Sequence, residues 1–222
     1  MFIHEKIEIG YEDLEVENGK NGRKYLAPNG ESYPSITTVL SVLSADSIAA
    51  WRARVGEEEA NKISGRASSR GTAVHDLVEK YLDNEELPKV LPHIKSSLVN
   101  LSPHLNRINK IFAQEAPLYS KHLGVAGRVD CVGEFDGVPS IIDFKTSRKP
   151  KKWEWCHNYF MQEAAYAVMW EERTGMPITN LVTIMDVDND QPIIFVEHRD
   201  NWVHKLKETI ELYHKKQRQR PL

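Results

Sequence analysis

Cysteine is scarce in this chain of 222 residues, which contains only Cys131 and Cys156. Two thiolates cannot complete a four-cysteine zinc or iron–sulfur site, so metal centres of that kind are excluded. The sequence leaves a disulfide open, although a reducing cytosol keeps both residues as thiols. We expect two ordinary buried or half-buried side chains.

Long apolar runs are also lacking, since no stretch approaches the ~20 residues that a membrane span requires. The N-terminus has neither the basic and apolar regions of a signal peptide nor the Arg- and Ser-rich character of a transit peptide. We therefore expect a cytoplasmic protein without a membrane partner. The small size and the lack of accessory domains suggest a phage-encoded protein acting in the host cytoplasm.

An excess of positive charge is missing as well, because 29 Lys and Arg residues face 32 Asp and Glu residues. A protein that coats nucleic acid through bulk charge is usually basic, so simple coating is disfavoured. An enzyme remains compatible, since its carboxylates can hold metal ions while local basic patches hold phosphates. The hydrophobic fraction of 41% and the charged fraction of 27% are typical of a globular protein.

Apolar periodicity predicts a helical first half followed by alternating sheet and helix. The expected helices cover residues 64–81, 94–112 (with Pro103 as a kink), 153–174 and 200–216. The expected strands cover residues 115–119, 125–135, 140–145, 181–185 and 192–196, after a short hairpin near residues 25–33. This order predicts one α/β domain with a mixed central β-sheet flanked by helices. Within it, residues 1–62 form a hairpin and helical region that could act as a lid, 63–200 a catalytic core, and 201–222 a C-terminal helix and basic tail.

Two carboxylates and a lysine stand close together in the predicted hairpin. Asp143 and Lys145 are two residues apart on one strand and share a face, and the Asp136-Gly137 turn can bring Asp130 alongside. Carboxylates that share a site repel, and a hard divalent cation such as Mg²⁺ or Mn²⁺ relieves that repulsion. The main-chain carbonyl of Phe144 would be a further ligand.

Such a centre suits phosphodiester hydrolysis, with metal ions neutralising charge and Lys145 orienting the attacking water. The spacing alone leaves a second interpretation open, in which Asp143 and Lys145 form a surface ion pair of little consequence.

The flanking motifs resemble a known family. Gly-Val-Ala-Gly-Arg-Val-Asp130 and Ile-Ile-Asp143-Phe-Lys145-Thr-Ser resemble the core motif of the PD-(D/E)XK nuclease superfamily, and more closely its RecB-like exonuclease branch. The segment Arg70-Gly71-Thr72-Ala73-Val74-His75 is similar to the helix that presents a metal-binding histidine in that branch. Glu115 stands where some members place an acidic ligand, and Gln162 and Tyr166 match a Gln-x-x-x-Tyr element. Residues 34–40 and 56–60 are similar to the N-terminal half of the mitochondrial genome maintenance exonucleases and related phage exonucleases.

The resemblance spans about residues 33–173. It departs from the family pattern at Val129, where the family name has proline, and the cysteine content excludes the iron–sulfur subtype. It implies a catalytic set of Asp130, Asp143, Lys145 and Gln162. It also implies a Mg²⁺ or Mn²⁺ site built by His75, Asp130, Asp143, Phe144 and Glu115.

Several further residues are candidates for substrate binding. Guanidinium groups suit phosphate, which favours Arg70 and Arg128, although Arg128 could instead be a structural partner of a carboxylate. A basic and aromatic patch typical of single-strand binding, or else a solvated loop with packed tryptophans, is formed by Lys149, Lys151, Lys152, Trp153 and Trp155. Tyr166 either faces the cleft or packs.

The sequence thus predicts a two-metal DNA exonuclease that prefers single-stranded ends. A structure-specific or nicking endonuclease and a catalytically inactive DNA-binding module remain as alternatives.

Overall fold

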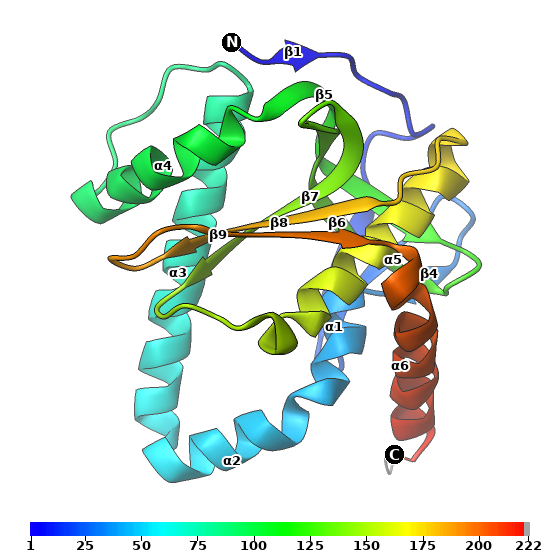
Figure 1. Ribbon diagram of the computed structural model, residues 1–222. Coiled ribbons are helices and arrows are strands. Elements are labelled where there is room, and N and C mark those ends of the chain that lie inside the picture. Colours follow the sequence, from blue (N-terminus) through cyan, green and yellow to red (C-terminus); the bar gives the residue numbers. More distant parts are fainter. Residues whose placement is uncertain (220–222) are drawn as a thin grey trace.

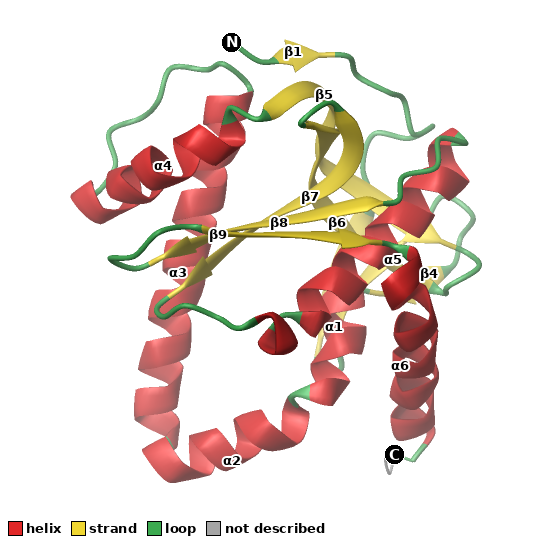
Figure 2. Ribbon diagram, viewed as in Figure 1, coloured by secondary structure: helices red, strands yellow, loops and turns green. Residues whose placement is uncertain are grey.

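The computed structural model describes residues 1–219, and the last residues of the predicted basic tail lie outside that range. A six-stranded sheet in the order β1-β5-β6-β7-β8-β9 forms its centre (Figures 1 and 2). The strands are β1 (Ile3–His4), β5 (Ile108–Ser120), β6 (Val125–Phe135), β7 (Val138–Ser147), β8 (Asn180–Val187) and β9 (Ile193–His198). The β1–β5 and β7–β8 pairs are parallel and the others are antiparallel, so the predicted mixed sheet is confirmed.

Helices cover both faces of this sheet (Figure 1). They are α1 (Ile36–Leu40), α2 (Ala45–Val55), α3 (Glu57–Leu82), α4 (Pro92–Leu105), α5 (His157–Thr174) and α6 (Asp200–Arg218), with short 3-10 helices η1 (Ser41–Leu43) and η2 (Trp153–Trp155). One hydrophobic cluster packs α1, α5 and α6 against the sheet, and a second packs α3 and α4 against it. Ile141 belongs to the first cluster and Ile142 to the second, because successive strand residues point to opposite faces.

A small three-stranded sheet lies beside the large one. Its strands are β2 (Glu15–Gly19), β3 (Gly22–Leu26) and β4 (Ser32–Pro34), so the predicted hairpin gains a third strand. Tyr25 and Tyr33 from this sheet pack with Tyr119 of β5 in a third hydrophobic cluster. The N-terminal segment is thereby fixed to β5, the strand that carries Glu115.

Helix α2 joins α1 to α3 as a bridge that stands away from the sheet (Figure 1). None of its residues is buried, and Ile48 is largely exposed. Gly56 follows it with a φ of +85°, a backbone conformation that suits glycine, and α3 begins at the next residue. The chain thus turns sharply between two helices that together frame an arch.

Two sequence predictions need correction. Helix α3 begins at Glu57, before the predicted start at residue 64. Helix α4 ends at Leu105 rather than at residue 112, and Ile108 and Ile111 lie on β5. The three-residue spacing of these isoleucines suggested a helix, but a register shift in β5 lets three residues oppose two on β6 and turns both isoleucines to the α3–α4 side. Among the described residues, no helix combines the length and apolar character needed to cross a membrane.

Candidate metal centre

The centre forms where two neighbouring strands part. Strands β6 and β7 pair from Phe135 and Val138 as far as Cys131 and Ile142, whereas β7 pairs with β8 from Ser140 to Ser147. From Asp143 onward, β7 therefore pairs with β8 alone. At this fork the Asp130 side chain accepts a hydrogen bond of 2.8 Å from the Phe144 amide. Asp130 therefore lies beside the Asp143–Lys145 segment, as the predicted hairpin requires.

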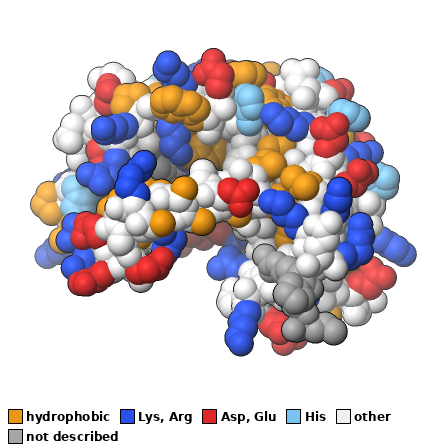
Figure 3. All heavy atoms as spheres, turned by 90° about the horizontal axis from the view of Figure 1, so that it is seen from below, with side chains coloured by type: hydrophobic (Ala, Val, Ile, Leu, Met, Phe, Trp, Pro, Cys, Tyr) orange, Lys and Arg blue, Asp and Glu red, His pale blue; other side chains and the backbone are white. Residues whose placement is uncertain are grey.

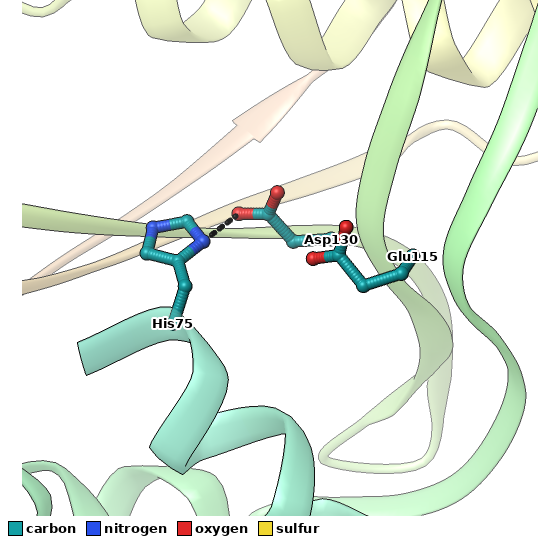
Figure 4. Close-up of side chains that lie close together, drawn as sticks. All are labelled: His75, Glu115 and Asp130. Carbon is teal, nitrogen blue, oxygen red and sulfur yellow. Dashed lines mark ion pairs between the residues drawn. The ribbon is translucent and has the colours of Figure 1, made fainter. Parts of the chain in front are cut away.

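Three potential ligands converge at the fork from different elements (Figure 4). His75 comes from α3, Glu115 from β5 and Asp130 from β6, and one ligand atom of each lies within 4.8 Å of the others. Nδ1 of His75 is 3.6 Å from a carboxylate oxygen of Asp130. All three side chains are half-buried, so an ion can reach them from solvent. Two carboxylates and an imidazole suit a divalent cation that prefers oxygen ligands and accepts a nitrogen.

Glu115 has an unusual backbone conformation within its strand. Its φ is +44°, in the left-handed region that a non-glycine residue occupies only at a cost in free energy. Arg128 holds this conformation, because its Nη1 donates a 2.5 Å hydrogen bond to the main-chain carbonyl of Glu115. Arg128 is itself fixed by a 2.5 Å ion pair with Asp13. The Arg128 guanidinium, which the sequence suggested as a phosphate ligand, therefore already has two partners within the protein.

Electrostatics at Glu115 also favour a cation. Burial, together with the nearby carboxylates of Asp130 and Glu79, raises the pKa of Glu115 to about 7. A positive charge among these groups would stabilise the ionised carboxylates and offset that shift. The donor set therefore fits a bound divalent cation.

Asp143 lies deeper than these three side chains. Its side chain is fully buried and forms an ion pair with Lys145, while neither carboxylate oxygen accepts a hydrogen bond of good geometry from the described residues. Burial raises the pKa of Asp143 to about 6, and the Lys145 ammonium opposes that shift. A buried carboxylate with unused lone pairs is costly, and a cation beside it would remove the cost.

Lys145 remains a strong cation in this setting. Burial favours the neutral amine, but the carboxylates of Asp143 and Asp130 outweigh it and raise the pKa of Lys145 above its usual value. Its Nζ also lies 5.3 Å from the centre of the Tyr159 ring, within the range of a cation–π contact. The lysine is thus charged and held at the fork.

Helix α5 forms the wall on the other side of Asp143 and Lys145. Gln162 Nε2 donates a 3.1 Å hydrogen bond to the Tyr166 hydroxyl, and both side chains are buried. Tyr166 packs so closely on β6 that a Cβ on Gly127 would lie 2.8 Å from the tyrosine ring. The structure therefore places Tyr166 as a packing residue beneath Gln162, away from solvent.

Sequence reasoning missed two residues of this wall, Tyr159 and Glu163. Glu163 is fully buried and accepts a hydrogen bond from Thr183, which pairs in register with Asp143. Burial and the nearby Asp143 raise the pKa of Glu163 well above its usual value. The two residues lie four apart and share a helix face, which is the signal that could have identified both.

The remaining predicted substrate residues do not converge on the fork. Arg70 is held by ion pairs to Asp186 and, at 2.6 Å, to Asp188. Trp153 Nε1 donates a 2.6 Å hydrogen bond to Glu197, within an aromatic cluster described below. The side chains of Arg70 and Trp153 are therefore already engaged by contacts within the protein.

The two lysines of the predicted patch differ from each other. Lys151 is half-buried and bonds to the Tyr159 hydroxyl, whereas Lys149 is exposed. Both remain open to a phosphate, since a lysine ammonium has three donors.

Comparison with known proteins places the chain near one group of exonucleases. It is 28% identical to human mitochondrial genome maintenance exonuclease 1 over 129 residues, which is 53% of this chain and 38% of the relative. The mouse protein of the same name is 28% identical over 130 residues, or 54% of this chain and 38% of the relative. The chain thus spans well under half the length of these relatives.

Other comparisons add little to this result. No family model matches the chain. A solved structure from Eubacterium rectale covers 70% of this chain and 71% of its own at 14% identity, with a TM-score of 0.45, which is too low to support an argument. Over about half of its length, the chain is therefore similar in sequence to the mitochondrial genome maintenance exonucleases, as its motifs predicted.

Proposed function

We propose that the chain is a metal-dependent DNA exonuclease that hydrolyses phosphodiester bonds at single-stranded ends. The observation that carries the proposal is the cluster of His75, Glu115 and Asp130 beside the buried Asp143–Lys145 pair. The names of the relatives, which refer to genome maintenance and to an exonuclease, support DNA as the substrate.

The proposed centre uses two Mg²⁺ or Mn²⁺ ions. His75, Glu115 and Asp130 would hold one of them, and Asp130, Asp143 and the carbonyl of Phe144 would hold the other. Bound divalent cations would polarise the phosphate and neutralise charge on the leaving oxygen.

The chain's own residues supply the remaining functions. Lys145 is charged and can donate hydrogen bonds to the attacking water or to a phosphate oxygen, and Asp143 and Tyr159 fix its position. Gln162 lies in the wall above Tyr166 and can hold a water through its free amide oxygen. The packed α5 wall excludes bulk water from the deep side of the fork.

The bridging helix α2 supports action at ends. It links α1 to α3 without burying a single residue and stands away from the sheet as a bridge rather than adding to the core (Figure 1). A strand that passes under such a bridge must enter by a free end. Residues 36–55 would then act as the lid that the sequence predicted within residues 1–62.

One experiment separates this proposal from an endonuclease. Linear and circular single strands of equal length are incubated with the protein in Mn²⁺, and the products are resolved on a denaturing gel. We expect the linear strand to shorten and the circle to stay intact. Cutting of the circle would overturn the exonuclease proposal in favour of an endonuclease.

A further inference from the structure

The segment that follows β7 carries two exposed tryptophans that differ in their ring contacts. Residues 148–156 leave β7 and project from the sheet on the side where α2 lies (Figure 1). Trp153 packs against other aromatic rings, with centroid distances of 4.6 Å to His157 and 5.7 Å to Trp202, although 43% of its surface remains exposed. Trp155 is 63% exposed, and among the described residues no aromatic ring stacks on it and its indole nitrogen donates no hydrogen bond.

The backbone fixes the direction of Trp155. Its amide donates to the carbonyl of Lys152 at 3.0 Å, and the amide of Cys156 donates to the carbonyl of Trp153 at 2.9 Å. The buried Cys156 thiol also contacts the Lys152 carbonyl at 3.4 Å. The packed Trp153 and this tight turn hold the backbone that carries the exposed Trp155 ring, which we call the stacking platform.

Cations and aromatic rings alternate between the catalytic lysine and this platform. Tyr159 stands between Lys145 at 5.3 Å and Lys151 at 4.8 Å, measured from each Nζ to the ring centre. The next residue, Lys152, is exposed, and its Nζ lies 5.7 Å from the centre of the Trp155 ring. These five side chains, which we call the aromatic–lysine track, lead from the fork to the surface.

The chemistry of the track suits one class of ligand. Lysines neutralise phosphates, and an exposed aromatic ring stacks on an unpaired base. A duplex offers no free base face, so the platform selects single strands. The surface seen from the α2 side mixes basic and acidic side chains (Figure 3), so a broad positive field does not explain strand binding there.

We propose that Trp155 is a base-stacking site for single-stranded DNA, with Lys151 and Lys152 contacting the adjacent phosphates. The site lies outside the predicted catalytic set, and it assigns base stacking to Trp155 alone among the two tryptophans of the predicted basic and aromatic patch. This inference rests on the proposed function, because that function makes single-stranded DNA the ligand. It adds the residues that would hold the DNA strand outside the fork.

The test measures binding separately from hydrolysis. Fluorescence anisotropy with Ca²⁺ in place of the reactive ion gives the Kd of the full chain for a labelled oligothymidylate and for an abasic strand of equal length. Replacing Trp155 by Leu should raise the Kd for the strand with bases about five-fold or more, and leave the Kd for the abasic strand unchanged. Replacing Trp155 by Tyr should retain most of the affinity. Leu91→Ala, at another largely exposed apolar side chain, is the matched control and should match the wild type.

Either of two results would overturn the inference: an unchanged Kd for Trp155→Leu, or an equal loss for both strands. The second result would assign Trp155 to backbone contact or to loop structure. Hydrolysis at saturating DNA provides the separate check on function. If the wild type fails to cleave DNA yet shows the base-dependent loss on Trp155→Leu, the stacking site stands and the exonuclease proposal fails.

Discussion

Arg128 donates a hydrogen bond to the main-chain carbonyl of Glu115, the residue of β5 whose φ of +44° turns its carboxylate toward Asp130. The cost of this backbone conformation falls on the folded chain, and the guanidinium contact offsets part of it. Arg128 therefore shapes the metal centre through the backbone.

Replacing Arg128 by Ala should weaken Mn²⁺ binding about 10- to 100-fold, the range seen when a group that orients a ligand is removed. Isothermal titration with Mn²⁺ measures the effect. Arg107→Ala removes another arginine–aspartate pair, with Asp136, and should leave Mn²⁺ affinity unchanged. If Arg128→Ala binds Mn²⁺ like the wild type but loses DNA affinity, the arginine contacts phosphate instead.

Replacing His75 by Ala should weaken Mn²⁺ binding at least as much, because it removes one of three converging ligands. Paramagnetic broadening of histidine NMR signals by Mn²⁺ provides a direct readout, since a ligating ring broadens first. His93→Ala, an exposed histidine at the start of α4, is the control. Equal Mn²⁺ affinity for His75→Ala and the wild type would exclude the histidine from the site.

The metal-free protein should lose stability as pH rises from about 4 to about 7. The folded-state pKa values of Glu115, about 7, and Asp143, about 6, lie above the ordinary values of 4.5 and 3.8. In that window the unfolded chain has released protons that the folded chain retains, so raising the pH favours unfolding. Thermal melts at pH 5 and pH 8 measure the loss, at about 2–4 °C for each kcal/mol. Added Mn²⁺ should restore the Tm at pH 8, and Glu115→Gln should flatten the pH dependence. A Tm that rises over this window in the absence of metal would contradict the account.

Breaking the Arg70 ion pairs should destabilise the fold. Asp186 is buried, and removing its arginine partner leaves an unpaired charge between α3 and β8. We expect Arg70→Ala to lower the free energy of unfolding by about 3–5 kcal/mol, measured by urea denaturation. Arg52→Ala, which breaks an exposed pair with Glu57, should leave the free energy of unfolding nearly unchanged. Unchanged stability with reduced DNA affinity would restore the phosphate role that the sequence suggested for Arg70.

The sequence predicted the sheet and most of its helices because local patterns decide them. Alternation in 125–135, the Asp136-Gly137 turn and the Gly175 cap each act within a few residues, and the structure agrees with them. The fork between Asp130 and Asp143 followed from strand spacing and one turn. Interactions between residues close in the sequence were sufficient to predict that these two side chains lie together.

Features that depend on tertiary contacts were missed. The bulges in β5 give Ile108 and Ile111 a helix-like spacing, so this part of the strand was predicted as helix. The carboxylates that pair with Arg70 and Arg128 lie more than 100 positions away in the sequence. Nor could local patterns show that Trp153 has aromatic neighbours, since one of them is the distant Trp202. Side chains that could bind phosphate were identified as a class, and only the fold shows which ones already have protein partners.

The most direct test of the account is the rate of nucleotide release from an end-labelled linear single strand with Mn²⁺. We measure it for the wild type, Lys145→Ala and the exposed-lysine control Lys62→Ala, with and without EDTA. The account predicts release by the wild type and by Lys62→Ala, abolition by EDTA, and a loss of about 100-fold or more in Lys145→Ala. Equal slow release by the wild type and Lys145→Ala, or full activity in EDTA, would contradict it.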